Sequence, residues 1–156
     1  PYNVSVPVLL HFLENFPSIK SGIVMVQSEV AMRLAASPGS KNYGAPSAKA
    51  AWWSDVLLSD SVSRKVFWPI PNVDSSLVSF QRHEPLGDEA LRKATFKVID
   101  LAFGKRRKML RASLAELFAS SAAVESAFRE IDIDPTLRGE SLSVHDFLRI
   151  AKLVTK

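Results

Sequence analysis

The sequence contains no cysteine among its 156 residues, and this absence removes several classes of function. A chain without cysteine has no disulfide framework, no thiolate ligand for zinc or an iron–sulfur cluster, and no cysteine nucleophile. The three histidines, His11, His83 and His145, stand far apart and show neither the HxH nor the HxxxH spacing of a metal site. The sequence therefore predicts a protein without a bound metal.

Long apolar runs are also missing. No stretch reaches the roughly 18 apolar residues of a membrane-spanning helix, and no basic and then apolar signal segment opens the chain. With 47% hydrophobic and 23% charged residues, the composition excludes a disordered, collagen-like or coiled-coil chain. We therefore expect a soluble, cytoplasmic globular protein that has no membrane partner.

A strong excess of one charge is absent, since the net charge of +4 does not by itself indicate a nucleic-acid partner. Five basic residues nevertheless fall within seven positions: Lys105, Arg106, Arg107, Lys108 and Arg111. Acidic residues nearby in the sequence are few, Asp100 and Glu116 being the nearest, so a polyanion would relieve the repulsion among these cations. The cluster is interpreted either as a phosphate-binding surface or as a solvated group of charges at the carbonyl end of a helix.

The first half of the chain alternates between helical and strand-like patterns. The spacing of apolar residues predicts helices over 6–16, 29–36 and 46–53, and strands over 23–26, 55–58 and 75–82. The run Ile23–Val26 is apolar at every position, which is typical of a strand buried on both faces of a parallel sheet. We therefore expect an α/β sheet in this half.

The strand patterns end near residue 84. Helical spacing then predicts helices over 88–103, 108–118, 122–130 and 143–153. Local pairs are also readable: Ser143 and Asp146 have the spacing of a capping box, and Glu29 and Arg33 that of an ion pair on one helix face. The chain is expected to consist of an α/β part and a small helical domain.

Three short segments could carry function. The loop over 38–46 contains Lys41 and two glycines but does not match GxxxxGK[ST], so it either contacts a substrate backbone or only connects two helices. Phe67 and Trp68 lie in a loop stiffened by two prolines, where a ring is ready to stack on a base unless it packs in a core. Tyr2, after the rigid Pro1, is either presented to a planar ligand or a core residue.

Five segments together resemble one family, the ribosomal RNA adenine dimethyltransferases of the KsgA type. They are PYNVSVPVLL, which resembles the second half of an NLPY motif and its following helix; VMVQSEVAMRLAASPGSKNYGAPS, with QxEVAxR and a G-x-x-YG turn; VFWPIPNVDSSLV, similar to FxPxPxVDS; AFGKRRKMLRASL, similar to FxxRRKxLR; and RGESLSVHDFLRIAKL, similar to the closing helix. Each match alone is weak, whereas five in the family's order are specific.

The resemblance implies a fold class and a domain division. Residues 1–83 would be the C-terminal part of a Rossmann-like S-adenosylmethionine-dependent methyltransferase sheet, and residues 84–156 a small all-helical RNA-binding domain. The family's glycine-rich cofactor loop and its acidic ribose partner would lie upstream of Pro1. The methyl donor S-adenosylmethionine would then bind to residues outside this chain, the chain alone would be inactive, and no metal is implied.

The resemblance also implies site residues. In the family, a motif tyrosine and a second aromatic residue stack on the target adenine, while an asparagine and a neighbouring main-chain carbonyl accept hydrogen bonds from its N6 amine. Carried onto this sequence, the catalytic residues are Tyr2 and Phe67, with Pro1 of the same motif. The expected ribosomal RNA contacts are Lys105, Arg106, Arg107, Lys108 and Arg111, with Lys41 as an addition.

The implied function is the S-adenosylmethionine-dependent dimethylation of adenine N6 in small-subunit ribosomal RNA during ribosome biogenesis. The implied enzyme is a monomer that acts on the pre-30S particle. Two alternatives remain: a macrolide-resistance methyltransferase that acts on large-subunit ribosomal RNA, and a non-catalytic RNA-binding assembly factor or a relative recruited as a mitochondrial transcription factor. The RRK element and the LSVHDF helix favour the first function.

Overall fold

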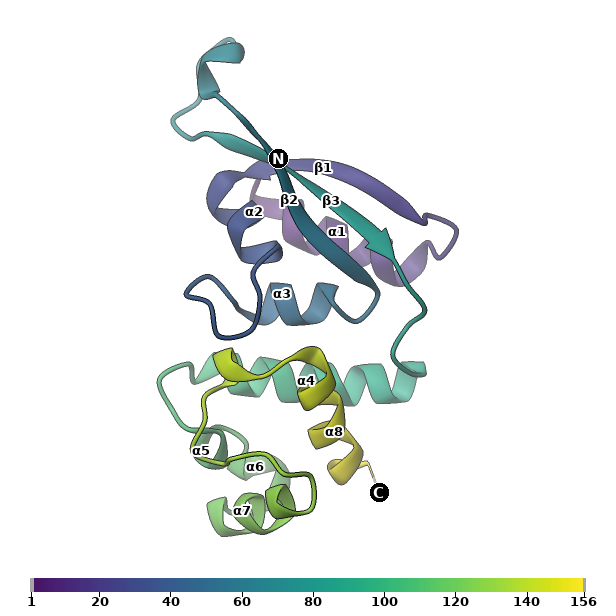
Figure 1. Ribbon diagram of the computed structural model, residues 1–156, viewed down its shortest axis with the longest axis vertical. Helices are drawn as coiled ribbons and strands as arrows, with labels where there is room; N and C mark the ends of the chain where they lie inside the picture. The colour runs from purple at the N-terminus through teal and green to yellow at the C-terminus, as the bar shows by residue number, and fades with distance from the viewer. Residues whose placement is uncertain (1, 156) are drawn as a thin grey trace.

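The computed structural model describes residues 2–155, and the side chain of Tyr2 lies outside that description. The first part of the chain forms η1 (Tyr2–Val4), α1 (Ser5–Asn15), β1 (Ser21–Gln27), α2 (Ser28–Leu34), α3 (Ala45–Ala50), β2 (Ser54–Val62), η2 (Arg64–Val66) and β3 (Ser75–Arg82). The second part forms α4 (Glu89–Gly104), α5 (Leu110–Ser113), α6 (Ala115–Phe118), α7 (Ser121–Arg129), η3 (Gly139–Ser141) and α8 (Val144–Val154). Figure 1 shows the sheet at one end, helices α4–α8 at the other, and α3 between them.

The three strands form one sheet with the order β1-β3-β2. Both outer strands run antiparallel to β3, with Gln27 and Val62 each opposite Ser75. The expected α/β architecture is confirmed. The parallel pairing inferred for the run Ile23–Val26 is wrong within this sheet, because β1 pairs only with an antiparallel neighbour among the described residues.

Helices cover one face of the sheet and leave the other open. On the covered face, Val26 and Val78 are buried and Phe80 packs with side chains from α1 and α3. On the other face, Ile23 is 68% and Leu57 is 66% exposed. We define the open face by Ile23, Met25 and Leu57, all of which are exposed. The expectation that β1 is buried on both faces is therefore also wrong for the chain as described.

Helices α4 to α8 supply most of a second core, in which Val98, Phe128 and Phe147 are fully buried. The single helix expected over 108–118 is instead divided into α5 and α6, with Leu114 between them. The hydroxyl of Ser113 donates to the carbonyl of Leu110 at 3.3 Å. The N–H of Leu114 still donates to the same carbonyl at 2.9 Å, and the N–H of Leu117 donates to the carbonyl of Leu114 at 2.9 Å, so a tighter turn at Leu114 divides the two helices.

The two parts of the chain are packed against each other. Tyr43 and Ala48, which precede the last two strands, belong to the helical core, whereas Val144 and Leu148 of α8 belong to the core beside the sheet. A boundary near residue 84 therefore marks a change of secondary structure and not a gap between cores. None of the helices between residues 2 and 155 has the length and apolar character needed to cross a membrane.

Two local predictions are confirmed. The Arg33 guanidinium lies 3.0 Å from Glu29 Oε1, four residues earlier on α2. The Ser143 hydroxyl accepts from the N–H of Asp146, and Asp146 Oδ2 accepts from the N–H of Ser143, so α8 begins with a capping box. Both interactions join residues three or four positions apart, which is why the sequence alone predicts them.

Candidate functional site

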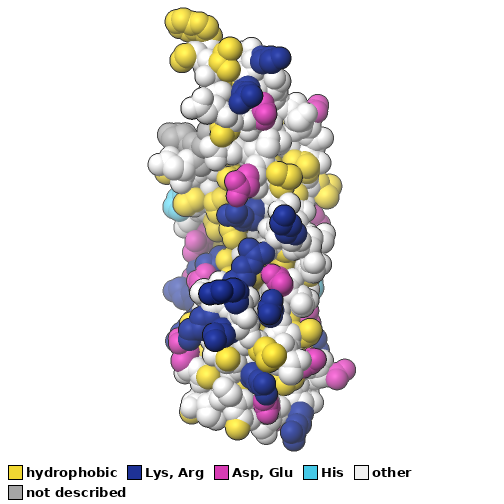
Figure 2. All heavy atoms as spheres, turned by 90° about the vertical axis from the view of Figure 1, so that its left-hand side faces the viewer, with side chains coloured by type: hydrophobic (Ala, Val, Ile, Leu, Met, Phe, Trp, Pro, Cys, Tyr) yellow, Lys and Arg dark blue, Asp and Glu magenta, His cyan; other side chains and the backbone are white. Residues whose placement is uncertain are grey.

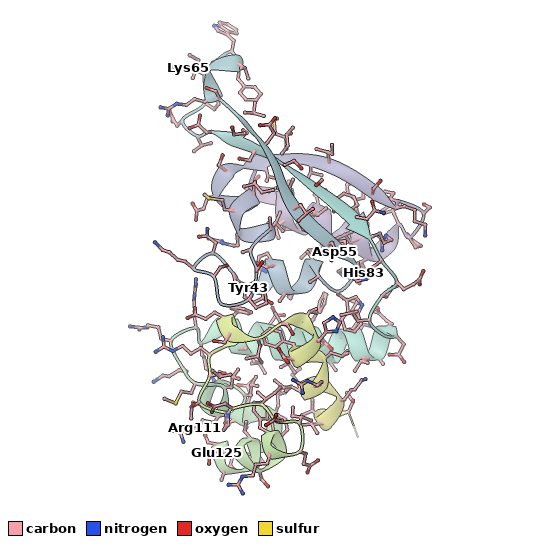
Figure 3. All side chains as sticks on the ribbon, in the orientation of Figure 1. Tyr43, Asp55, Lys65, His83, Arg111 and Glu125 are labelled. Carbon is pink, nitrogen blue, oxygen red and sulfur yellow. The ribbon has the colours of Figure 1, made fainter. Side chains whose placement is uncertain are left out.

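The connection between β2 and β3 projects beyond the end of the sheet (Figure 1). We define the hairpin tip as residues 63–73. Hydrogen bonds close its base: the N–H of Arg64 donates to Asp74 Oδ1 at 3.0 Å, and the Arg64 guanidinium donates to the carbonyl of Asn72 at 3.2 Å. The N–H of Lys65 donates to Ser63 Oγ at 3.3 Å. Lys65 lies at the projecting end of the molecule (Figure 3). The tip is therefore a closed structure and not a loose connection.

The hairpin tip carries the predicted aromatic pair. Phe67 is half-buried and belongs to none of the three hydrophobic cores found among the described residues, whereas Trp68 is 94% exposed. The alternative interpretation, that a ring of this pair packs in a core, is therefore wrong for Trp68. Pro1 and the side chain of Tyr2 lie outside the described residues, so contact of Tyr2 and Phe67 with one adenine stays a prediction.

The backbone brings the start of the chain to the same end of the sheet as the hairpin tip. Val4 at the start of α1 and Val26 near the end of β1 line one hollow of about 540 Å³. Gln27, the next residue of β1, is paired with Ser75, which follows the tip. Two segments that are more than sixty residues apart in sequence are thus held close to one edge of the molecule.

The predicted basic cluster begins where α4 ends at Gly104. Gly104 and the four consecutive cations that follow it line a shallow hollow of about 390 Å³. Figure 2 shows Lys and Arg side chains spread over one face of the molecule, from its upper end to the helical part. A concave surface lined by cations suits a phosphate group, because field lines converge there.

Acidic residues from elsewhere in the sequence neutralise part of this cluster. Lys105 lies 3.6 Å from Glu116, Arg106 lies 3.3 Å from Glu140, and Arg111 lies 2.7 Å from Glu125. Glu116 was expected near the cluster, whereas the expectation that few other acidic residues are near is wrong for Arg106 and Arg111. Asp100, which was expected to be near, instead lies 2.6 Å from Lys49.

The other two cations of the cluster differ from these. Arg107 and Lys108 make no ion pair with any acidic side chain of residues 2–155, and both are exposed. Lys41 approaches the cluster through its backbone, since its carbonyl accepts from Arg106 Nη2 at 3.0 Å. The structure thus separates cations that are paired with acidic side chains from cations without such a pair among residues 2–155.

The loop over 38–46 is a connector fixed at several points. The N–H of Gly39 donates to the carbonyl of Glu140 at 2.7 Å, and the N–H of Gly44 donates to Ser47 Oγ at 3.1 Å. Tyr43 is 3% exposed, and its burial, with a smaller contribution from the Asp146 carboxylate, raises the pKa of its hydroxyl well above the ordinary value. Tyr43 therefore stays neutral in the core, and this arrangement supports the connector interpretation of the loop.

The hollow beside α1 and β1 does not offer the polar groups that S-adenosylmethionine needs. The hollow beside α1 and β1 is lined by apolar side chains, with Ser5 as the polar exception among its described residues. A carboxylate for the ribose hydroxyls is missing from that lining. No group of three or more His, Asp or Glu side chains that could hold a metal ion occurs among residues 2–155.

Sequence reasoning missed which aromatic and basic side chains are accessible. The pairing of Arg106 with Glu140 and of Arg111 with Glu125 joins residues 34 and 14 positions apart, and no local pattern signals such partners. The exposure of Trp68 beside the half-buried Phe67 likewise follows from how the tip projects. The prolines around this pair were the one signal in the sequence that pointed to a rigid tip.

Comparison with known proteins gives a consistent result. The family model described as ribosomal RNA adenine dimethylase matches residues 1–156. Proteins named ribosomal RNA small subunit methyltransferase A from Leifsonia xyli and Thermobifida fusca are 57% and 53% identical over 153 and 152 residues, respectively. The match covers 97% of this chain in both cases but 54% and 53% of the relatives. The chain therefore spans about half the length of these relatives.

Two solved structures share the fold. A dimethyladenosine transferase from Plasmodium falciparum superposes with a TM-score of 0.81 at 22% identity, covering 96% of this chain and 62% of that one. The 23S rRNA methyltransferase ErmE superposes with a TM-score of 0.69 at 21% identity, covering 100% of this chain and 63% of that one. At these identities the likeness concerns the fold alone.

Proposed function

Because the chain belongs to the ribosomal RNA adenine dimethylase family, we propose that it is the C-terminal part of an S-adenosylmethionine-dependent enzyme that dimethylates adenine N6 in small-subunit ribosomal RNA. We call that longer protein the complete protein. The observation that carries the proposal is the position of the hairpin tip with Phe67 and the start of α1 at one end of the sheet. This end of the sheet would receive the target base.

The chemistry explains what the two aromatic residues would do. The lone pair of the adenine N6 amine is delocalised into the ring, so the amine is a poor nucleophile and must be held in line with the methyl group of the donor. Positioning of this kind supplies a large part of an enzymatic rate. Tyr2 and Phe67 would grip the faces of an adenine that has left its helix, as enzymes acting on bases require. The groups that bind the donor would come from the upstream half.

The open face supports the proposed position of this chain in a larger Rossmann-like sheet. Ile23 and Met25 are exposed although both belong to an apolar strand, and Val8 and Phe12 of α1 are 42% and 41% exposed beside the edge of β1. Exposed apolar patches of this kind mark surfaces that another part of a protein covers. We propose that the upstream half covers them and that residues 84–156 form the RNA-binding helical domain.

This proposal predicts how the chain behaves toward the methyl donor. Titration calorimetry of residues 1–156 with S-adenosylmethionine should give no saturable binding, because the hollow beside α1 and β1 has no carboxylate for the ribose among its described residues and the proposed donor site lies in the upstream half. The complete protein should bind the same compound with a saturable isotherm. A tight isotherm from residues 1–156 alone would contradict the placement of the donor site in the upstream half.

The basic cluster would contact phosphates of the RNA. The complete protein would act as a monomer on the pre-30S particle in the cytoplasm. The identity of 57% and 53% to relatives named for the small subunit favours this substrate over large-subunit RNA. The likeness to ErmE, at 21% identity, does not support a large-subunit substrate in the same way.

Replacing both Arg107 and Lys108 by alanine should flatten the dependence of RNA affinity on salt. Each lost phosphate contact reduces the slope of log affinity against log salt concentration by about 0.7–0.9, so the double variant should lose roughly 1.5. The measurement is fluorescence anisotropy of a labelled ribosomal RNA fragment at several salt concentrations. Arg106→Ala is the comparison variant: because its guanidinium is partly engaged with Glu140 and the carbonyl of Lys41, it should lower the slope by less than either Arg107→Ala or Lys108→Ala alone. An unchanged slope in the double variant would remove both cations from the interface.

A further inference from the structure

Trp68 occupies an unusual position for a tryptophan. Its side chain is 94% exposed, whereas Trp52 and Trp53 are 1% and 4% exposed. Large aromatic side chains gain free energy when they are buried, so one that is held almost entirely in water indicates a surface that a partner covers. The neighbouring Val66 and Ile70 are also exposed, at 69% and 61%.

The hairpin tip holds this ring on a stiff support. Pro69 and Pro71 fix the backbone on one side of Trp68, and the hydrogen bonds from Arg64 to Asp74 and Asn72 close the tip at its base. A ring that is already positioned loses little conformational entropy when it stacks on a planar ligand. The tip is therefore prepared for a contact that uses the face of the indole.

The charges around Trp68 indicate which planar ligand it suits. The hairpin tip contains two cations, Arg64 and Lys65, and the carboxylate nearest to it in sequence, Asp74, lies at its base, where it accepts from the N–H of Arg64. Aromatic rings combined with cations are the features by which proteins bind single-stranded nucleic acid, through base stacking and phosphate contacts. An apolar protein partner would not need the cations.

We infer that Trp68 stacks on an unpaired nucleotide next to the adenine that is methylated, and so adds an RNA-binding platform to the hairpin tip. This inference rests on the proposed function. Phe67 is half-buried on the hairpin tip, whereas the neighbouring Trp68 is 94% exposed, so the two rings lie in different surroundings and serve different bases. Phe67 grips the target base, and Trp68 holds the strand that leads to it.

A change in tryptophan fluorescence on binding would come mainly from Trp68, because Trp52 and Trp53 are buried. The test is to titrate the chain with a single-stranded oligoribonucleotide of adenosines and to follow tryptophan emission. We expect saturable quenching. An abasic oligonucleotide of the same length, which keeps the phosphates, should quench much less. Equal quenching by the two probes would overturn the stacking.

Variants of the tip separate stacking from a general apolar contact. Trp68→Ala should weaken binding of the labelled adenosine oligonucleotide about tenfold, and Trp68→Phe, which keeps an aromatic face, about threefold. Ile70→Ala is the matched control, because Ile70 is exposed on the same tip and has no aromatic face, and its affinity should change less than twofold. Equal losses in Trp68→Ala and Ile70→Ala would overturn the inference.

Kinetics of the complete protein distinguish this inference from the proposed function. Trp68→Ala should raise the KM for ribosomal RNA about tenfold with kcat unchanged. A fall in kcat with unchanged KM, or an emission of Trp68 already shielded from a soluble quencher before RNA is added, would overturn the inference. If the unaltered complete protein does not methylate ribosomal RNA, the proposed function fails, while the titration of the chain still decides whether Trp68 stacks on bases.

Discussion

Replacing Phe67 by alanine in the complete protein should lower kcat for adenine methylation by about a hundredfold or more, while the affinity for ribosomal RNA changes by about threefold or less. The reason is that a poor nucleophile reacts at a useful rate only when it is held in line with the methyl group. A displacement of about 1 Å can cost a hundredfold in rate. Most of the binding free energy comes from phosphate contacts elsewhere, which this substitution leaves intact.

Single-turnover methylation at saturating RNA measures the effect, with anisotropy for the affinity. Phe67→Tyr keeps an aromatic face and should retain most of the rate, whereas Phe67→Leu keeps apolar bulk without that face and should behave like Phe67→Ala. Trp68→Ala is expected to show the opposite pattern, with a weaker affinity and an unchanged rate. Equal losses of rate and affinity in Phe67→Ala would argue against a base clamp that includes Phe67.

The secondary structure could be predicted where local pattern decides it, and β1 shows where such prediction ends. The run Ile23–Val26 indicated a strand, and the strand is there. The prediction that β1 is buried on both faces is wrong for this chain. An apolar strand indicates that its side chains are covered, but it does not indicate which segment of the protein covers them. In the proposed complete protein, the upstream half would cover Ile23 and Met25, which are exposed here.

The candidate site also combines features that the local sequence predicts with features that appear only once the chain has folded. The spacing of the sequence predicts that Phe67 lies in a loop and that five cations cluster after a helix, whereas their part in a binding site rests on the resemblance and stays a prediction. The partners of Arg106 and Arg111 could not be predicted, because Glu140 and Glu125 approach only once the helices have packed. Charge clusters in a sequence therefore overstate the charge available to a partner, and here Arg107 and Lys108 remain.

Replacing Arg92 by alanine should have the largest effect on folding, lowering the free energy of unfolding by about 1–3 kcal/mol, mainly through lost packing of its side chain against two rings. The Arg92 side chain on α4 is only 10% exposed, and its guanidinium lies 2.6 Å from Glu14 of α1 and 2.6 Å from Glu89. It also lies 5.6 Å from the ring of Trp53 and 5.0 Å from that of Phe96. Its loss would leave Glu14 without this ion pair, Glu89 with Lys93 alone, and a gap beside two rings, where the sheet part meets the helical part. Urea denaturation of the chain measures the change.

The same contacts make this part of the stability depend on pH. Hydrogen bonds from Arg92 lower the pKa of Glu89 from 4.5 to about 2. A carboxyl group with a lower pKa in the folded state stabilises the fold above its ordinary pKa, and this contribution disappears as the pH falls through the folded value. The difference in the free energy of unfolding between the original chain and Arg92→Ala should therefore be constant near neutral pH and should shrink from about pH 4.5 toward pH 2.

Lys93→Ala is the control, because Lys93 is 71% exposed and 3.4 Å from Glu89, and it should cost about 0.5 kcal/mol or less. A difference that stays constant between neutral pH and about pH 3 would show that Glu89 does not take part in this stabilisation.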